Sequence, residues 1–266
     1  MSLPNIPAGK RNIRGVAGAI VRRIRSASPG HIETDDAICQ AYIGTGGKKT
    51  KYTLVNFPSL LSPNDATDCI YTLTLYDQNG ERVGVQNVRV PAMGTAEVVP
   101  ETIFGRSLPE IGLLAVQIQA GSLLSYAGRH LGPIRAHFYA MYHDAKMSSM
   151  AVVHPQSVVF SARQEPTAWR STMAICPEKL GAIELFQINP TPVEVETELS
   201  IRTLGGSRLA SSAGRIQPMG IRRIFWKSSD FLDSKYVCVS SDSITAPNAK
   251  PLIFQHFKSG FSASHS

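Results

Sequence analysis

The chain has 266 residues, of which 43% are apolar and 18% are charged, so it can bury a sizeable core and is not disordered overall. Its net charge is +7, but six basic residues precede the first acid, Glu33, which leaves only +1 for the rest. A body so close to neutral gives no electrostatic case for a nucleic-acid groove. No apolar run reaches the roughly 18 residues that span a bilayer, and no signal peptide of the usual form is present. These features favour a cytoplasmic protein.

The basic residues are concentrated in an N-terminal arm, predicted over residues 1–32. Apolar residues from Ile13 to Ile24 recur at the spacing of an amphipathic helix. The candidate tethering residues on its polar side are Arg11, Arg14, Arg22, Arg23 and Arg25. Four roles remain open for this arm: packing on the body or on a neighbouring subunit, lying on an anionic membrane, mitochondrial-type targeting, and nucleic-acid binding.

Short alternating segments bounded by Gly, Pro and Asn follow the arm and predict antiparallel strands. They lie at 36–43, 51–57, 69–77, 82–90, 95–99 and 111–119, and a hairpin spans 133–154. Asn79-Gly80 is a strong hairpin-turn signal between two of these strands. Residues 33–156 therefore predict a first β-sandwich.

The chain then repeats its landmarks in the same order, which predicts an internal duplication. The matched pairs are Ala37-Ile38-Cys39 with Ala174-Ile175-Cys176, Asn56 with Asn189, Asn79-Gly80 with Gly205-Gly206, 90–94 with 216–220, 114–118 with 236–240, and the hairpin 133–154 with 251–265. Residues 157–170 are predicted to connect the copies, and 171–266 to form a second sandwich. The expected fold is all-β, with two tandem antiparallel β-sandwiches of jelly-roll or Ig-like type, packed about a pseudo-twofold axis and preceded by a basic arm or helix.

The order of these motifs resembles a known family. An Asn-ended strand, the Tyr76–Gly80 turn, the Val88–Thr95 turn and the Pro-x-x-x-His-Phe segment of 133–143 are similar to the small bacterial β-sandwich of the sensory rhodopsin transducer type. Residues 251–257 carry the likeness in the second copy. The resemblance implies a non-enzymatic binding or assembly module, with carbohydrate or another small molecule as ligand. The fused duplication and the basic arm depart from the family pattern.

Histidines near the two hairpins are the candidate ligand-binding residues. The set comprises His143, Asp144, His154, His256 and His265, together with the neighbouring Tyr142. A two-residue loop at Ser259-Gly260 would place His256 opposite Ala263, on one face with His265. The pair could then share a metal ion or a water molecule. The competing interpretation is structural, because histidines on a half-exposed hairpin face often bond to a neighbouring strand.

Catalytic patterns are sparse. There is no GxSxG, HExxH or Walker loop, and none of the four cysteines forms a CxxC pair, so no cofactor is expected. The leading hypothesis is a non-catalytic binding or assembly protein that recognises a carbohydrate or another small polar ligand at the hairpins or between the copies. Self-association or a protein partner is expected, and the arm could contact a membrane surface. The alternatives are a metal- or His-dependent enzyme at the copy interface and a virion or filament subunit.

Overall fold

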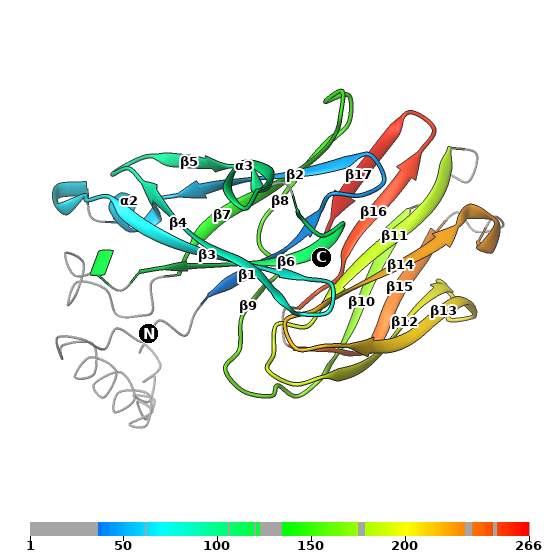
Figure 1. Ribbon diagram of the computed structural model, residues 1–266. Helices are drawn as coiled ribbons and strands as arrows, with labels where there is room; N and C mark the ends of the chain where they lie inside the picture. The colour runs from blue at the N-terminus through cyan, green and yellow to red at the C-terminus, as the bar shows by residue number, and fades with distance from the viewer. Residues whose placement is uncertain are drawn as a thin grey trace, which may run out of the picture.

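The computed structural model describes residues 37–61, 63–105, 107–119, 121–122, 135–174, 179–231, 236–246 and 249–265. Within these ranges the chain forms strands β1 to β17, paired antiparallel in four sheets, with a few short helical turns (Figure 1). The predicted all-β class and antiparallel pairing are therefore confirmed. The N-terminal arm, with its five candidate arginines, lies outside the described residues.

Sheets I and II are built from the first part of the chain. Sheet I has the order β4-β3-β6-β1-β9, and sheet II has the order β5-β2-β7-β8. Their strands are β1 (Ile38–Ile43), β2 (Lys48–Val55), β3 (Cys69–Asp77), β4 (Arg82–Val90), β5 (Thr95–Val98), β6 (Ile111–Ile118), β7 (His137–Asp144), β8 (Met150–Val153) and β9 (Ser157–Val158). The short helical turns here are α2 (Phe57–Leu61), η1 (Pro63–Asp65) and α3 (Pro100–Ile103).

Sheets III and IV follow. Sheet III has the order β10-β15-β12-β13, and sheet IV has the order β14-β11-β16-β17. Their strands are β10 (Thr167–Ala174), β11 (Leu180–Ile188), β12 (Val195–Thr203), β13 (Arg208–Ile216), β14 (Ile221–Lys227), β15 (Tyr236–Ile244), β16 (Leu252–Phe257) and β17 (Gly260–Ser264), with one short turn, η3 (Ser228–Asp230). Apart from β9, each strand of sheets I and II has the same neighbours as the strand nine places later in sheets III and IV.

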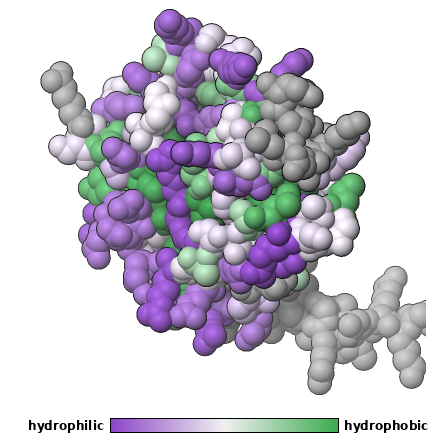
Figure 2. Space-filling view, turned by 90° about the vertical axis from the view of Figure 1, so that its right-hand side faces the viewer, coloured by the Kyte–Doolittle hydropathy of each residue, from purple (hydrophilic) through white to green (hydrophobic). Residues whose placement is uncertain are grey.

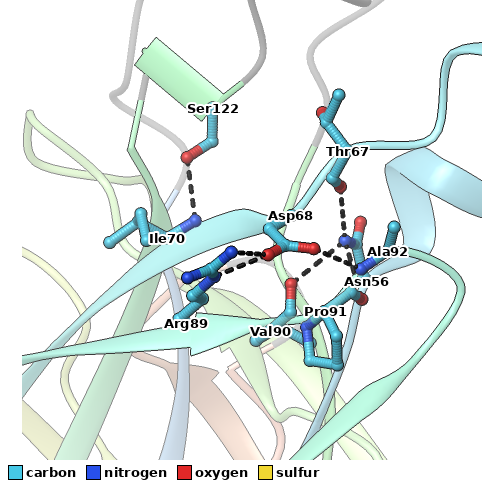
Figure 3. A network of polar contacts seen from close by, with 9 residues as sticks. All are labelled: Asn56, Thr67, Asp68, Ile70, Arg89, Val90, Pro91, Ala92 and Ser122. Atoms are coloured by element: carbon cyan, nitrogen blue, oxygen red, sulfur yellow. Dashed lines mark hydrogen bonds and ion pairs between the residues drawn. The ribbon is translucent and has the colours of Figure 1, made fainter.

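A buried asparagine ends one strand in each half and holds the same kind of turn. The Asn56 side-chain amide donates to the carbonyls of Thr67, Val90 and Pro91 at 2.9, 3.2 and 3.0 Å (Figure 3). Its backbone N–H donates to Gly94 O at 3.0 Å. Because the Asn56 side chain is fully buried, these bonds supply its amide with the partners that water cannot provide.

The second half repeats this arrangement around Asn189. Its amide donates to the carbonyls of Val193, Ile216 and Gln217 at 2.7, 3.1 and 3.0 Å, and its backbone N–H donates to Gly220 O. The methionine before the closing glycine has a left-handed backbone in both turns, with φ of 55° at Met93 and 58° at Met219. We call each buried asparagine with the turn that it holds an asparagine clamp. An ion pair between an acid and an arginine lies beside each clamp, Asp68 with Arg89 (Figure 3) and Glu194 with Arg215.

Two hydrophobic cores result. Alternation places Tyr71, Leu73 and Leu75 of β3 in the first core, as the sequence pattern predicts. That core lies between sheets I and II, and the outer face of sheet IV also packs into it through residues such as Phe186 and Phe254. The second core lies between sheets III and IV, and Trp226 is buried there.

The contact between the two halves, called the seam, is closely packed. Gly80, at φ +82°, leaves no room for a side chain, because a Cβ there would lie 1.9 Å from the main-chain carbonyl oxygen of Pro218. Ile221 N donates to Gln78 O at 3.1 Å beside it. Strands β8 and β17 also run side by side along the seam.

Equivalent residues of β8 and β17 meet, yet the seam as a whole is not twofold symmetric. The outer face of sheet IV is covered by the first half, whereas the equivalent face of sheet II exposes Tyr139, Met150 and Val152. A twofold axis would give both faces the same surroundings. The expected pseudo-twofold packing is therefore wrong for the seam as a whole, because β8 and β17 meet through equivalent residues while the outer faces of sheets II and IV have different surroundings.

Two predicted boundaries differ from the structure. Ser157–Val158, expected in the connection, pair with β1, and β10 begins at Thr167, before the predicted start of the second sandwich. The match of Cys39 to Cys176 is wrong by six residues. Cys39 pairs with Ala115 on β6, and Arg170 holds the equivalent place opposite β15.

Most of the face drawn in Figure 2, on the side of the second half, carries hydrophilic side chains around a central band of apolar ones. In the part of the chain that the structure describes, no helix is long and apolar enough to cross a membrane. Cys39, Cys69 and Cys238 are buried free thiols, as expected for lone cysteines in apolar strands. Burial raises the pKa of the Cys69 thiol to about 11.

Candidate functional site

A pocket of about 440 Å³ opens on the seam where both hairpins end. The first half lines it with the start of β7 and the segment from β8 to β9, and the second half adds Lys250 and His265. Its side chains include His137, Tyr139, His154, Gln156, Ser157 and Val158. This volume is within the range of about 300–1,000 Å³ that is usual for small-molecule sites. We call it the seam pocket.

His154 and His265 meet in this pocket. Each follows the last strand of its hairpin, and the β7–β8 and β16–β17 registers place them at equivalent positions. Their rings pack edge to face, with centroids 4.0 Å apart and an interplanar angle of 76°. The two histidines thus hold the same place relative to the strands of their hairpins, and the seam brings them into contact.

Main-chain carbonyls determine which nitrogen of each ring carries a proton. His154 Nδ1 lies 3.2 Å from Pro155 O, and His265 Nε2 lies 2.7 Å from His154 O. A carbonyl oxygen only accepts, so both of these nitrogens must donate. In the neutral rings His154 Nε2 and His265 Nδ1 are then acceptors.

The surroundings favour a neutral His265. Burial lowers its pKa, and the nearby His154 and Lys250 lower it further by charge, although the hydrogen bond to His154 O acts in the opposite direction. Gln156 fixes the base of the pocket. Its amide accepts from Ala41 N at 3.0 Å and donates to Lys250 O at 2.9 Å, which ties the two halves together.

His256 belongs to a different site, centred on a buried carboxylate. Glu184 of β11 is fully buried and contacts three basic side chains: Lys48 Nζ at 3.0 Å, Arg223 Nε at 2.5 Å and the His256 ring at Nε2, 2.7 Å away. Lys48 comes from the first half, so this carboxylate cluster joins the halves across the seam. Burial acts to raise the pKa of Glu184, but the His256 hydrogen bond and the Lys48 charge lower it to about 2.

The remaining candidate residues are held by local structure. Asp144 accepts hydrogen bonds from the backbone of Lys146, Ser148 and Ser149, and so shapes the β7–β8 turn. Tyr142 is buried and donates to Ala41 O at 2.7 Å.

His143 is buried with its Nδ1 beside Asp144 O at 2.9 Å. Its Nε2 is buried without a hydrogen-bond partner, and nothing in the described structure explains this.

The four hairpin histidines therefore do not converge. The turn between β16 and β17 is Lys258-Ser259, one residue earlier than predicted, so His256 faces Phe261 rather than Ala263. This shift separates His256 from His265, and the expected shared metal or water site is wrong. No group of three or more metal-binding side chains is present in the described ranges.

Sequence reasoning missed Glu184, Gln156 and Lys250. Glu184 stands inside an apolar strand, LGAIELFQI, and an isolated acid in such a run is a usable signal of a buried charge. Gln156 and Lys250 lie in connections, and no local pattern marks them.

A second pocket of about 390 Å³ lies between the β3–β4 turn and strand β14. Three arginines line it, but Arg215 pairs with Glu196 and Arg223 with Glu184, while Arg222 donates to Thr197 O and Ala213 O. These arginines already have partners within the chain, so the seam pocket is the stronger candidate site.

No family model and no curated protein matches this chain. Among solved structures it is similar to Bacteroides uniformis β-glucuronidase, with a TM-score of 0.20 and 11% identity over 85% of this chain and 25% of that one. A glycosyl hydrolase family 2 member from Bacteroides cellulosilyticus gives 0.21 and 10%, over 85% and 27%. The chain spans about a quarter of those proteins, and TM-scores this low carry no argument. The resemblance to the sensory rhodopsin transducer type stays a prediction.

Proposed function

We propose that this chain is a non-catalytic binding protein that recognises a small polar ligand, with carbohydrates among the candidates, in the seam pocket. The observation that carries the proposal is the joint construction of this pocket by the ends of two equivalent hairpins. The pocket combines hydrogen-bonding groups with the exposed ring of Tyr139. Such a ring can stack on the apolar face of a sugar.

Binding rather than turnover is supported by how the ionisable residues are used. Asp144 holds a turn, Glu184 is paired with Lys48 and Arg223, and Tyr142 is bonded inside the core. None of these groups lines the seam pocket. A general acid or base must reach the reacting atoms, so these residues are poor candidates for catalysis.

A duplicated pair of β-sandwiches underlies this site in our proposal. The shared strand order, the two asparagine clamps and the paired left-handed methionines support it. Duplication would explain why two histidines from equivalent positions meet at one seam.

The binding proposal is tested by a ligand-observed NMR screen of saccharides and small polar metabolites. His154→Trp fills the mouth of the pocket with a larger ring, and Lys146→Trp, on the exposed far turn of the same hairpin, is the matched control. Ligands should lose their signal with His154→Trp and keep it with Lys146→Trp. A screen without hits, or hits that survive in both variants, would overturn the proposal.

A second role, self-association, is supported by the outer face of sheet II. Tyr139, Met150 and Val152 are 46%, 55% and 57% exposed there, whereas the equivalent face of sheet IV is covered by the first half. Lys51 and Glu97 form an ion pair on this face, with Lys51 Nζ 3.3 Å from Glu97 Oε1. A second copy that presents the same face would match apolar to apolar and Lys to Glu about a twofold axis.

Sedimentation equilibrium tests this role. The wild type should form a dimer, Val152→Lys should be a monomer, and Val83→Lys, at an exposed position on β4, should remain a dimer. A wild-type monomer at high concentration would contradict it.

A further inference from the structure

We propose that the seam pocket selects a small hydroxylated carboxylate, whose hydroxyl groups donate to His154 and His265 and whose carboxylate pairs with Lys250. This inference rests on the proposed function, because it names the class of ligand that the same pocket would take.

The two imidazoles point to a ligand that donates hydrogen bonds. Both rings donate one N–H to a main-chain carbonyl, so each is left with one acceptor nitrogen. Two rings whose centroids lie 4.0 Å apart, each with one acceptor nitrogen, suit the hydroxyl groups of a polyol. A ligand with only acceptor atoms would find no partner on these nitrogens.

The charge of the lining points to an anion. Among the described residues that line the pocket, Lys250 is the one lysine or arginine, and no Asp or Glu accompanies it. Its ammonium group lies close enough to act on His265 by charge. An ammonium that meets a carboxylate in a recess makes a stronger bond than two neutral groups would.

A metal ion fits this pocket less well than a hydroxylated anion. The two histidines supply two ligands, and the described residues hold no group of three that could bind a metal. Lys250 would also place a positive charge near the bound cation. Structural and catalytic zinc sites ordinarily use three or four protein ligands.

Isothermal titration calorimetry with three probes separates these contributions. Gluconate has hydroxyl groups and a carboxylate, glucose has hydroxyl groups alone, and acetate has a carboxylate alone. Wild-type protein should bind gluconate at least tenfold more tightly than glucose or acetate. Lys250→Gln should bring gluconate down to the level of glucose, whereas Lys258→Gln, on the exposed β16–β17 turn, should bind like the wild type.

The role of the histidines as hydrogen-bond acceptors is tested by replacing His265 with a residue that lacks an acceptor and with one that has an acceptor. His265→Phe should weaken gluconate and glucose alike by about tenfold, and His265→Gln should restore most of the affinity because its carbonyl oxygen accepts. Equal binding of gluconate and glucose, unchanged in Lys250→Gln, would overturn the ligand class but leave the binding function standing, provided His154→Trp abolishes both. Absence of binding by all three probes at millimolar concentration would overturn the ligand class, and an empty saccharide and metabolite screen would then remove the binding function as well.

Discussion

Replacing Glu184 with Gln should lower the free energy of unfolding, because this residue is the centre of the carboxylate cluster that joins the two halves. Its side chain is fully buried and Lys48 is 5% exposed. Glu184→Gln keeps the shape but leaves the Lys48 ammonium without an anionic partner in the interior. Breaking a buried ion pair in this way costs about 3–5 kcal/mol. For a chain of this size the melting temperature should fall by roughly 10 °C.

The matched control is the pair at the equivalent positions of sheet II. Lys51 and Glu97 occupy the places of Glu184 and Arg223 with reversed charges, and their side chains are 30% and 58% exposed. Lys51→Gln should cost about 0–1 kcal/mol, because exposed ion pairs contribute little. Both variants are compared with wild type by chemical denaturation. The reasoning is refuted if Glu184→Gln is no more destabilising than Lys51→Gln.

The same residue predicts a pH dependence. The pKa of Glu184 is lowered to about 2 in the folded chain, whereas an exposed glutamate titrates near about 4.3. The folded state therefore gains stability above the unfolded value and loses it as the pH falls from about 4.3 to about 2, by roughly 3 kcal/mol. Glu184→Gln lacks this component, so the difference between wild type and variant should shrink across that window. A difference that stays constant there would contradict the assigned pKa.

Three further predictions concern the scaffold. Asn56→Ala removes three hydrogen bonds donated by a buried amide and should cost about 2–4 kcal/mol, measured by thermal unfolding. Gly80→Ala should destabilise the chain more than Gly47→Ala, because both have positive φ but only Gly80 would place its Cβ against backbone across the seam; equal losses would remove the close approach as the cause. Cys39 and Cys69 should not react with a thiol reagent until the chain unfolds, and rapid labelling of the native protein would show that these strands open.

Most of the fold could be predicted from the alternation of residues along each strand and from the residue types in the turns. The segment from Cys69 to Asp77 alternates between buried and half-buried residues, because one face meets the core, and its predicted bounds are those of β3. The Asn-Gly and Gly-Gly turns were also correctly predicted, since Gly80 and Gly206 both adopt positive φ. These features depend on neighbours along the chain, which a sequence displays directly.

Long-range packing could not be read in the same way. The match of Cys39 to Cys176 relied on three apolar letters, and such triplets recur wherever strands are buried. Register is instead determined by hydrogen bonding to β6 and β15, which places Arg170 in the position of Cys39. The partners of Glu184 were hidden for a related reason, because Lys48 reaches it only through the seam.

The contrast between His143 and His256 shows how two halves with the same strand order come to have different surroundings. The two residues occupy equivalent registers, opposite Lys49 and Ala182. Only His256 reaches a buried carboxylate, because the outer face of sheet IV is covered by the first half and that of sheet II is not. The two halves are similar but pack unequally, so equivalent residues have different surroundings. The histidines that end the hairpins meet at the seam, so a ligand site built from both halves can form there once per chain.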